Sequence, residues 1–332
     1  MKKILTFVCA CLLCITSCFC FVGCKKDKSA KGVIRLNEVT HSVFYAPLYV
    51  AMNLGYMEEE GITIELTNGG GSDASMTALL SKNADMALMG PETVVYVEHG
   101  GSTNHPVVFG QLTKKDGCFL ISKTPINNFD FSTDLNGKTA IIGRKGGMPA
   151  MTFEWICNNV NVYNGTNVTL DTSTAFNMMA SVFESTSAEF CTMFEPTASE
   201  FVAAGKGYYV ASVGEHSGEI PYTCFMAYPE YIKNNKAQVQ GFLRAIKKAY
   251  LYITTNSSIN VAKALKPSFD GTSETSLAAA VEKYLEIDAW SSSPTMSKDS
   301  YSRLLSVLKN AGTITKDVEF SKVVDNSLAN EI

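Results

Sequence analysis

Apolar and polar positions change period repeatedly along the first part of the chain. Residues 33–36 and 62–66 alternate between apolar and polar, which is typical of half-buried strands, and residues 86–89 form a short apolar run. Helical periodicity separates these runs. The predicted strands are 33–36, 62–66, 86–89 and 107–109, and the predicted helices are 47–54, 73–81 and 91–98. This alternation predicts an α/β unit with a parallel sheet and right-handed crossovers.

The alternation starts again after Gly117 and predicts a second α/β unit. Its expected strands are 119–121, 138–142, a short run around Val168, 190–194 and 208–210, and its expected helices are 148–159, 175–183 and one beginning near Pro196. From Pro229 onward, apolar residues recur at helical spacing only. That part predicts four helices packed on the first unit, at 238–254, 259–265, 276–287 and 298–309.

The N-terminus has the layout of a secretory signal, with Lys2 and Lys3 before an apolar run that ends at Val22. An uncleaved membrane helix is the alternative, because the run is long enough to span a bilayer. The sequence Val-Gly-Cys at 22–24 resembles the bacterial lipoprotein cleavage box. We therefore expect a signal over 1–23, acylation of Cys24, a flexible tether over 24–32, and an extracytoplasmic location on the cell membrane.

The net charge and the spacing of the cysteines argue against nucleic-acid binding and against a zinc site. The formal net charge is -4, and no basic block follows the tether, which argues against nucleic acid as a partner. The cysteines after Cys24 are Cys118, Cys157, Cys191 and Cys224. They form no CxxC pair, so no zinc site is expected; buried free thiols are expected, with a disulfide as the alternative. Neither a metal nor another cofactor is predicted.

Five segments look familiar when taken together: THSVFYAPLYVA at 40–51, GYMEEEGI at 55–62, GGGSD at 69–73, ADMAL at 84–88 and FEP at 194–196. The set resembles the substrate-binding proteins of ABC importers for thiamine pyrimidine precursors, for sulfonates such as taurine, and for nitrate. The resemblance implies a type II periplasmic-binding fold, which has two α/β lobes and a ligand between them. Lobe 1 would comprise 33–113 and 224–332, lobe 2 would comprise 114–223, and the crossovers would lie near 111–112 and 222–223.

Ligands of open α/β sheets lie beyond the carboxyl ends of the strands, over the N-termini of helices. Glycines at these ends could offer N–H groups or could merely turn the chain. Phe44 and Tyr45 could stack on a planar ligand or pack against the other lobe. The predicted ligand-binding residues are His41, Phe44, Tyr45, Gly70, Gly71, Ser72, Pro91, Glu92, Gly146, Gly147, Met148, Glu195 and Tyr222.

A carboxylate at the end of a strand favours a particular ligand class. Glu195 follows a run of apolar or small residues, and by the resemblance it would accept hydrogen bonds from a ring amine. A buried acid also disfavours an anion beside it. The sequence thus predicts a small-molecule receptor for a pyrimidine-like nitrogen heterocycle, which closes by a hinge motion and docks on permease subunits as a monomer.

Three alternatives stay open at this point: a receptor for sulfonate, nitrate or another small anion, a pyrimidine-synthase-like enzyme, and a structural surface lipoprotein. The enzymes related to this fold carry a cysteine-rich motif. The nearest string here, Cys18-Phe19-Cys20, lies in the signal, and no GxSxG motif is present. We therefore expect no catalysis by this chain.

Overall fold

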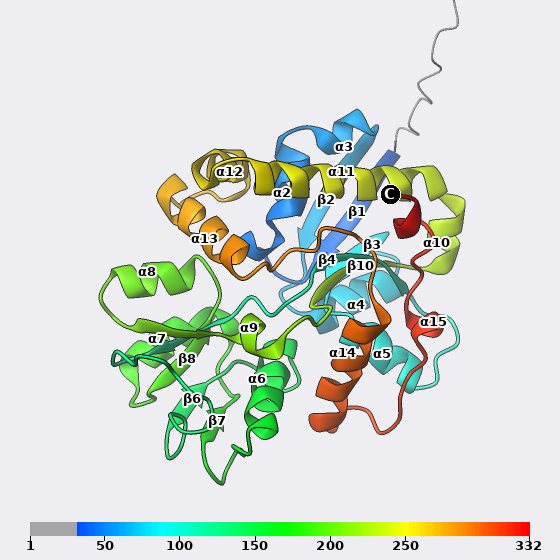
Figure 1. Ribbon diagram of the computed structural model, residues 1–332. Helices are drawn as coiled ribbons and strands as arrows, with labels where there is room; N and C mark the ends of the chain where they lie inside the picture. Colours follow the sequence, from blue (N-terminus) through cyan, green and yellow to red (C-terminus); the bar gives the residue numbers. More distant parts are fainter. Residues whose placement is uncertain (1–31) are drawn as a thin grey trace, which may run out of the picture.

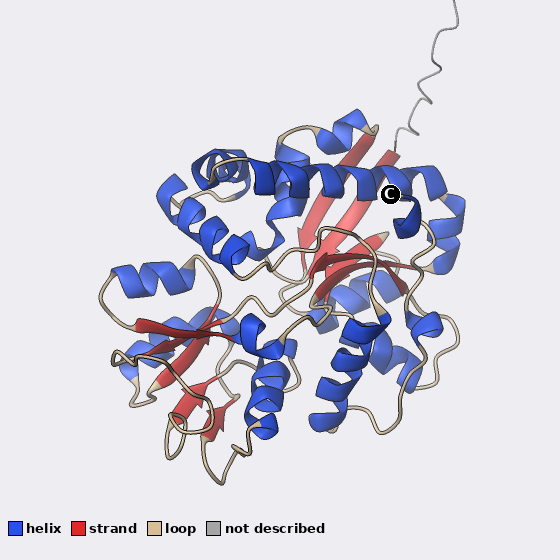
Figure 2. Cartoon of the chain, viewed as in Figure 1, coloured by secondary structure: helices blue, strands red, loops and turns tan. Residues whose placement is uncertain are grey.

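The computed structural model describes residues 32–332 and contains two five-stranded sheets, seen as separate groups of arrows in Figure 2. The first sheet has the order β2-β1-β3-β10-β4 and the second has the order β7-β6-β8-β5-β9. The strands are β1 (Gly32–Glu38), β2 (Ile62–Asn68), β3 (Met86–Met89), β4 (Val107–Thr113), β5 (Phe119–Ser122), β6 (Thr139–Ile141), β7 (Thr169–Asp171), β8 (Phe190–Met193), β9 (Tyr208–Ser212) and β10 (Thr223–Ala227). We call each sheet, with the helices that cover it, a lobe.

Both sheets are mixed, so the expectation of purely parallel sheets is wrong in one strand of each lobe. In lobe 1, β10 pairs antiparallel with both β3 and β4. In lobe 2, β5 pairs antiparallel with both β8 and β9. These are the two strands by which the chain enters or re-enters a lobe from the other one, so their direction depends on the crossovers. Side-chain periodicity within a strand carries no information about that direction.

The helices lie close to the predicted positions, and each lobe is covered by its own set. Those of lobe 1 before the first crossover are η1 (Val43–Tyr45), α2 (Ala46–Asn53), α3 (Tyr56–Glu59), α4 (Ser72–Leu80) and α5 (Glu92–His99). Those of lobe 2 are α6 (Met148–Asn159), η2 (Phe176–Met178), α7 (Met179–Ser185), α8 (Thr197–Ala203) and α9 (Val213–Ser217). The short helices α3 and α9 were not predicted.

The C-terminal part is helical, as expected, and its helices pack on both sides of the lobe 1 sheet (Figure 1); we call them together the C-terminal layer. Its elements are α10 (Pro229–Asn234), α11 (Lys236–Thr255), α12 (Ser258–Leu265), η3 (Lys266–Ser268), α13 (Glu274–Glu286), α14 (Lys298–Asn310), α15 (Phe320–Val323) and η4 (Ala329–Glu331). Helices α11 and α12 pack on α2, whereas α13 contacts α8 and α14 contacts α6 of lobe 2 (Figure 1). The C-terminal layer therefore reaches across to the other lobe at two places.

Two crossovers join the lobes, at 114–118 and 218–222. They are paired through their backbones, because the Ile220 N–H donates to the Lys114 carbonyl at 2.9 Å. Strand β4 continues through Thr113, so residues 111–112 belong to the sheet and the first crossover begins slightly later than predicted. The lobe 2 sheet lies wholly within 119–212. This arrangement supports the predicted division of the chain, whose boundaries at 113/114 and 223/224 stay a prediction.

Burial of the core is extensive in both lobes. The first core cluster runs through lobe 1 and into the interlobe face of lobe 2, and a second cluster fills the far side of lobe 2. All four cysteines of the described chain are buried and free, which confirms the expected thiols. Within residues 32–332, every helix falls short of the length and apolar character that crossing a bilayer requires. The predicted signal, Cys24 and the tether before Gly32 lie outside the described residues.

Candidate ligand site between the lobes

The first group of candidate residues surrounds a buried carboxyl at the start of α5. Glu92 lies three residues after the end of β3 and is 4 % exposed. The Ser72 hydroxyl and the Glu92 N–H face this carboxyl, whereas Oε2 has no hydrogen-bond partner. The Thr223 side chain lies beside the Tyr45 hydroxyl nearby. We call Tyr45, Ser72, Glu92 and Thr223 the Glu92 site.

Local structure explains how a carboxyl can occupy this position. A Cβ on Gly90 would lie 2.0 Å from Glu92 Oε2 and 2.4 Å from Oε1, so only glycine leaves room for the acid to fold back over the strand end. Burial raises the pKa of Glu92 to about 7. A neutral or half-ionised acid with a free oxygen is ready to accept a hydrogen bond from a bound molecule.

The Glu92 site faces lobe 2. One turn along α5, the Tyr96 hydroxyl contacts Met151 Sδ of α6 at 3.5 Å. At the mouth of the gap, Arg144 Nη1 lies 3.8 Å from the position that a Gly71 Cβ would take. The glycine turn before α4 and the turn before α6 therefore lie close together, and their contact with a ligand stays a prediction. In this arrangement Gly70, Gly146 and Arg144 are exposed, Gly147 is half-buried and Met148 is buried.

An aromatic cluster of Phe44, Phe194, Tyr222 and Tyr284 joins the two lobes. The Phe44 ring lies 5.4 Å from Phe194 of lobe 2, 5.8 Å from Tyr222 and 5.1 Å from Tyr284, measured between ring centroids. The Phe44 carbonyl also accepts from Trp290 Nε1 at 2.8 Å. Of the two roles open to Phe44 in the sequence, the structure shows packing against the other lobe. Phe225, by contrast, packs inside lobe 1 against Phe242.

A second buried acid lies in the first crossover and was not predicted. Asp116 is fully buried, its Oδ1 accepts from the Cys118 N–H at 2.7 Å, and burial raises its pKa to about 7. Tyr222 of the other crossover lies beside it, yet neither Asp116 Oδ2 nor the Tyr222 hydroxyl completes a hydrogen bond. The only sequence signal was an acidic residue before Gly117, which is also the usual composition of an exposed turn.

Two predicted ligand residues are bonded within their own lobes. His41 Nδ1 lies 2.9 Å from Glu38 Oε1 and its Nε2 lies 2.7 Å from the Ser268 carbonyl, so the ring ties the first loop to the C-terminal helices. Glu195 is 2 % exposed, and its carboxylate accepts from the Ser199 N–H and from the Tyr209 hydroxyl. Contact of either side chain with a ligand stays a prediction.

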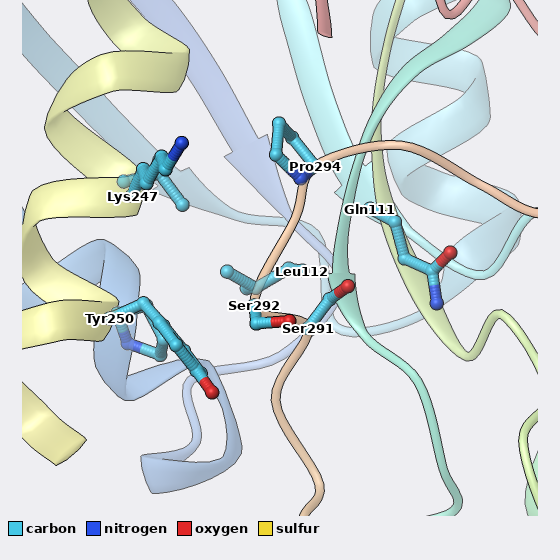
Figure 3. Close-up of a pocket in the computed structure, with 9 residues that line it drawn as sticks. Gln111, Leu112, Lys247, Tyr250, Ser291, Ser292 and Pro294 are labelled. Atoms are coloured by element: carbon cyan, nitrogen blue, oxygen red, sulfur yellow. The ribbon is translucent and has the colours of Figure 1, made fainter. Parts of the chain in front are cut away.

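A small hollow elsewhere in lobe 1 is a poor alternative site (Figure 3). It lies between α11 and residues 291–294 and has a cavity volume of about 10 Å³, which is room for one water molecule. Ligand pockets typically enclose roughly 300–1,000 Å³. Its lining carries no carboxylate: Pro47, Gln111, Leu112, Ile246, Lys247, Tyr250, Ser291, Ser292 and Pro294. Over residues 32–332, no group of three or more His, Cys, Asp or Glu side chains is placed to hold a metal ion.

Comparison with known proteins places the chain in a family. Residues 43–258 match the family model described as NMT1/THI5 like. A protein of Bacillus subtilis (strain 168), named "Putative binding protein YtlA", is 36% identical over 323 residues, covering 97% of this chain and 96% of the relative.

Solved structures share the fold at low identity. A ligand-binding component of an ABC-type import system from Staphylococcus aureus, with zinc bound, superposes with a TM-score of 0.72 at 14% identity, covering 90% of this chain and 98% of that one. The aliphatic sulphonate-binding protein SsuA from Escherichia coli superposes with a TM-score of 0.70 at 13% identity, covering 90% and 99%. The fold is thus that of the periplasmic binding proteins, and the chain belongs to the NMT1/THI5-like family.

Proposed function

We propose that this protein is the extracytoplasmic solute-binding component of an ABC importer, which captures a small nitrogen-bearing molecule between its lobes. The two-lobed fold, the facing glycine turns and the relatives named as binding proteins support this role. The solute would contact both lobes and so favour the closed arrangement by its differential affinity. The closed protein would then dock as a monomer on permease subunits, held at the membrane by lipid on Cys24.

The observation that carries the ligand class is the free oxygen of Glu92. A buried acceptor without a partner costs about 1–3 kcal/mol, and a ligand that donates a hydrogen bond would recover that cost. A ring amine or a protonated ring nitrogen is such a donor, whereas sulfonate and nitrate offer only acceptors. A pyrimidine-like heterocycle, with one face toward the aromatic cluster, suits both features. Glu195 is a weaker candidate for this contact because Ser199 and Tyr209 already engage its carboxylate.

A small-anion receptor is the second candidate, and one observation favours it. The exposed Arg144 and Lys145 lie in the turn before α6, close to the Gly71 turn of lobe 1. An anion at the mouth of the gap would meet these two cations and the N-terminus of a helix. An enzymatic role has no comparable support, since the relative that matches nearly the whole chain is named as a binding protein.

Native mass spectrometry of the purified chain tests the ligand class directly. We expect a fraction of the protein to carry one co-purified molecule that contains nitrogen and is neutral or cationic in solution. Denaturation should release it for identification by its exact mass. Recovery of a sulfonate or another anion as the bound molecule would replace the proposed class with the second candidate.

A further inference from the structure

Helix α13 belongs to the C-terminal layer of lobe 1 but makes a direct contact with lobe 2. The Tyr284 hydroxyl accepts a hydrogen bond from the Glu195 N–H at 3.1 Å. Tyr284 is fully buried, and its ring packs on Phe44 of lobe 1 and, with a centroid distance of 6.2 Å, on Phe119 of lobe 2. In Figure 1, α13 lies directly over α8, which begins just after Glu195. One side chain thus spans the gap behind the candidate site.

The group that Tyr284 contacts is held rigidly within lobe 2. The Glu195 carboxylate accepts from Tyr209 and Ser199, and the Tyr209 hydroxyl also lies 2.9 Å from Ser199 Oγ. This network fixes the orientation of the Glu195 N–H toward α13. Beside it, Lys283 Nζ lies 5.2 Å from the centre of the Tyr209 ring. The backbone N–H that Tyr284 contacts therefore belongs to a residue whose side chain is held by several hydrogen bonds.

The helix that carries Tyr284 is equally well fixed in lobe 1. Ser273 caps its N-terminus by accepting from the Ser276 N–H at 3.0 Å, and Tyr284 packs on Trp290, with ring centroids 5.7 Å apart. When the lobes separate, the Tyr284–Glu195 hydrogen bond and the ring contacts to lobe 2 must break. Contacts that exist only in the closed arrangement shift the open–closed equilibrium toward it.

We infer that Tyr284 is a closure latch: a positioning residue whose hydroxyl holds lobe 2 against lobe 1 and thereby slows release of the solute. This role rests on the proposed function as a two-lobed receptor. The hydroxyl holds the closed arrangement with or without the solute, so its loss speeds dissociation and does not slow association. A side chain that only stabilised lobe 1 would affect neither rate.

The test compares Tyr284→Phe with Tyr301→Phe. The control also loses a buried hydroxyl, one that donates to the Val318 carbonyl at 3.0 Å, but both partners lie in the C-terminal layer. Association and dissociation of 4-aminopyrimidine are measured by stopped-flow with intrinsic tryptophan fluorescence. For Tyr284→Phe we expect dissociation to quicken by about 2- to 10-fold, the range for one neutral hydrogen bond, and association to be no slower than in wild type. Tyr301→Phe should match wild type in both rates.

A second measurement separates failure of the latch from failure of the proposed function. If wild type does not bind 4-aminopyrimidine, the latch is tested by the radius of gyration of the solute-free proteins. The radius should be larger for Tyr284→Phe than for Tyr301→Phe. If wild type, Tyr284→Phe and Tyr301→Phe bind the probe and dissociate at the same rate, Tyr284 is not a latch. If none of them binds the probe, an equal radius of gyration in all three overturns the inference. Absence of any bound small molecule in wild type counts against the receptor function alone.

Discussion

Replacement of Glu92 by Gln should weaken solute binding by about 10- to 150-fold, the range expected when a hydrogen bond to a charged group is lost. The substitution keeps the shape of the side chain and its contact with Ser72, but it exchanges an acceptor oxygen for a donor NH₂. A ligand N–H would then meet either a neutral acceptor or another donor. Isothermal titration calorimetry with the co-purified solute, or with 4-aminopyrimidine, measures the change.

The direction of this change also distinguishes the two ligand classes. A buried carboxylate repels an anion, so Glu92→Gln should tighten binding of an alkanesulfonate without an amine, or of nitrate, if either is the true solute. Glu65→Gln, at an exposed position of β2, serves as the matched control and should leave affinity unchanged. An unaltered dissociation constant in Glu92→Gln would remove this residue from the site.

The solute-free protein should lose stability as the pH rises from about 5 to 7.5. Burial raises the pKa of Glu92 from 4.5 to about 7 and that of Asp116 from 3.8 to about 7, so between these values the folded state holds protons that the unfolded state has released. The stabilisation is complete below the unfolded pKa and is lost as the pH passes the folded pKa. Each group should contribute on the order of 3 kcal/mol to the drop.

Urea unfolding at pH 5.0 and at pH 7.5 measures this drop, and the double variant Glu92→Gln with Asp116→Asn isolates its source. The pKa of His41 is also raised, chiefly by its hydrogen bond to Glu38. Its deprotonation therefore also lowers the free energy of unfolding as the pH rises. The comparison is therefore the difference between wild type and double variant, with Glu65→Gln as control. A drop of the same size in the double variant would mean that the two acids are already ionised in the folded protein.

The sequence predicted most elements because strand and helix periods are local properties. Alternation at 62–66 and the apolar run at 86–89 both became strands of lobe 1. Strand β10 at 223–227 was not predicted, although the region was expected to follow the second crossover. The strand lies between β3 and β4 in the lobe 1 sheet. Its position depends on pairing with β3 and β4, which are distant in sequence, and a five-residue run cannot reveal such pairing.

The sequence could nominate Glu92 because it lies shortly after a strand, and its contact with a ligand stays a prediction. The candidate site was not predictable where burial results from contacts between lobes. Asp116 has the composition of a turn residue, yet it is fully buried. Tyr284 reads as one apolar position of an amphipathic helix, and its contact with Glu195 joins residues 89 positions apart. His41 was placed in the correct loop, but Glu38 and Ser268 determine where its ring points.

Small-angle X-ray scattering during titration with the solute tests most directly whether the molecule is captured between the lobes. Closure of two lobes around a shared ligand should decrease the radius of gyration, with a saturation curve that follows the calorimetric binding isotherm. Glu92→Gln should reach the same final radius at higher solute concentration. A radius that stays constant while binding saturates would show that the solute binds within a single lobe, and would contradict capture by closure.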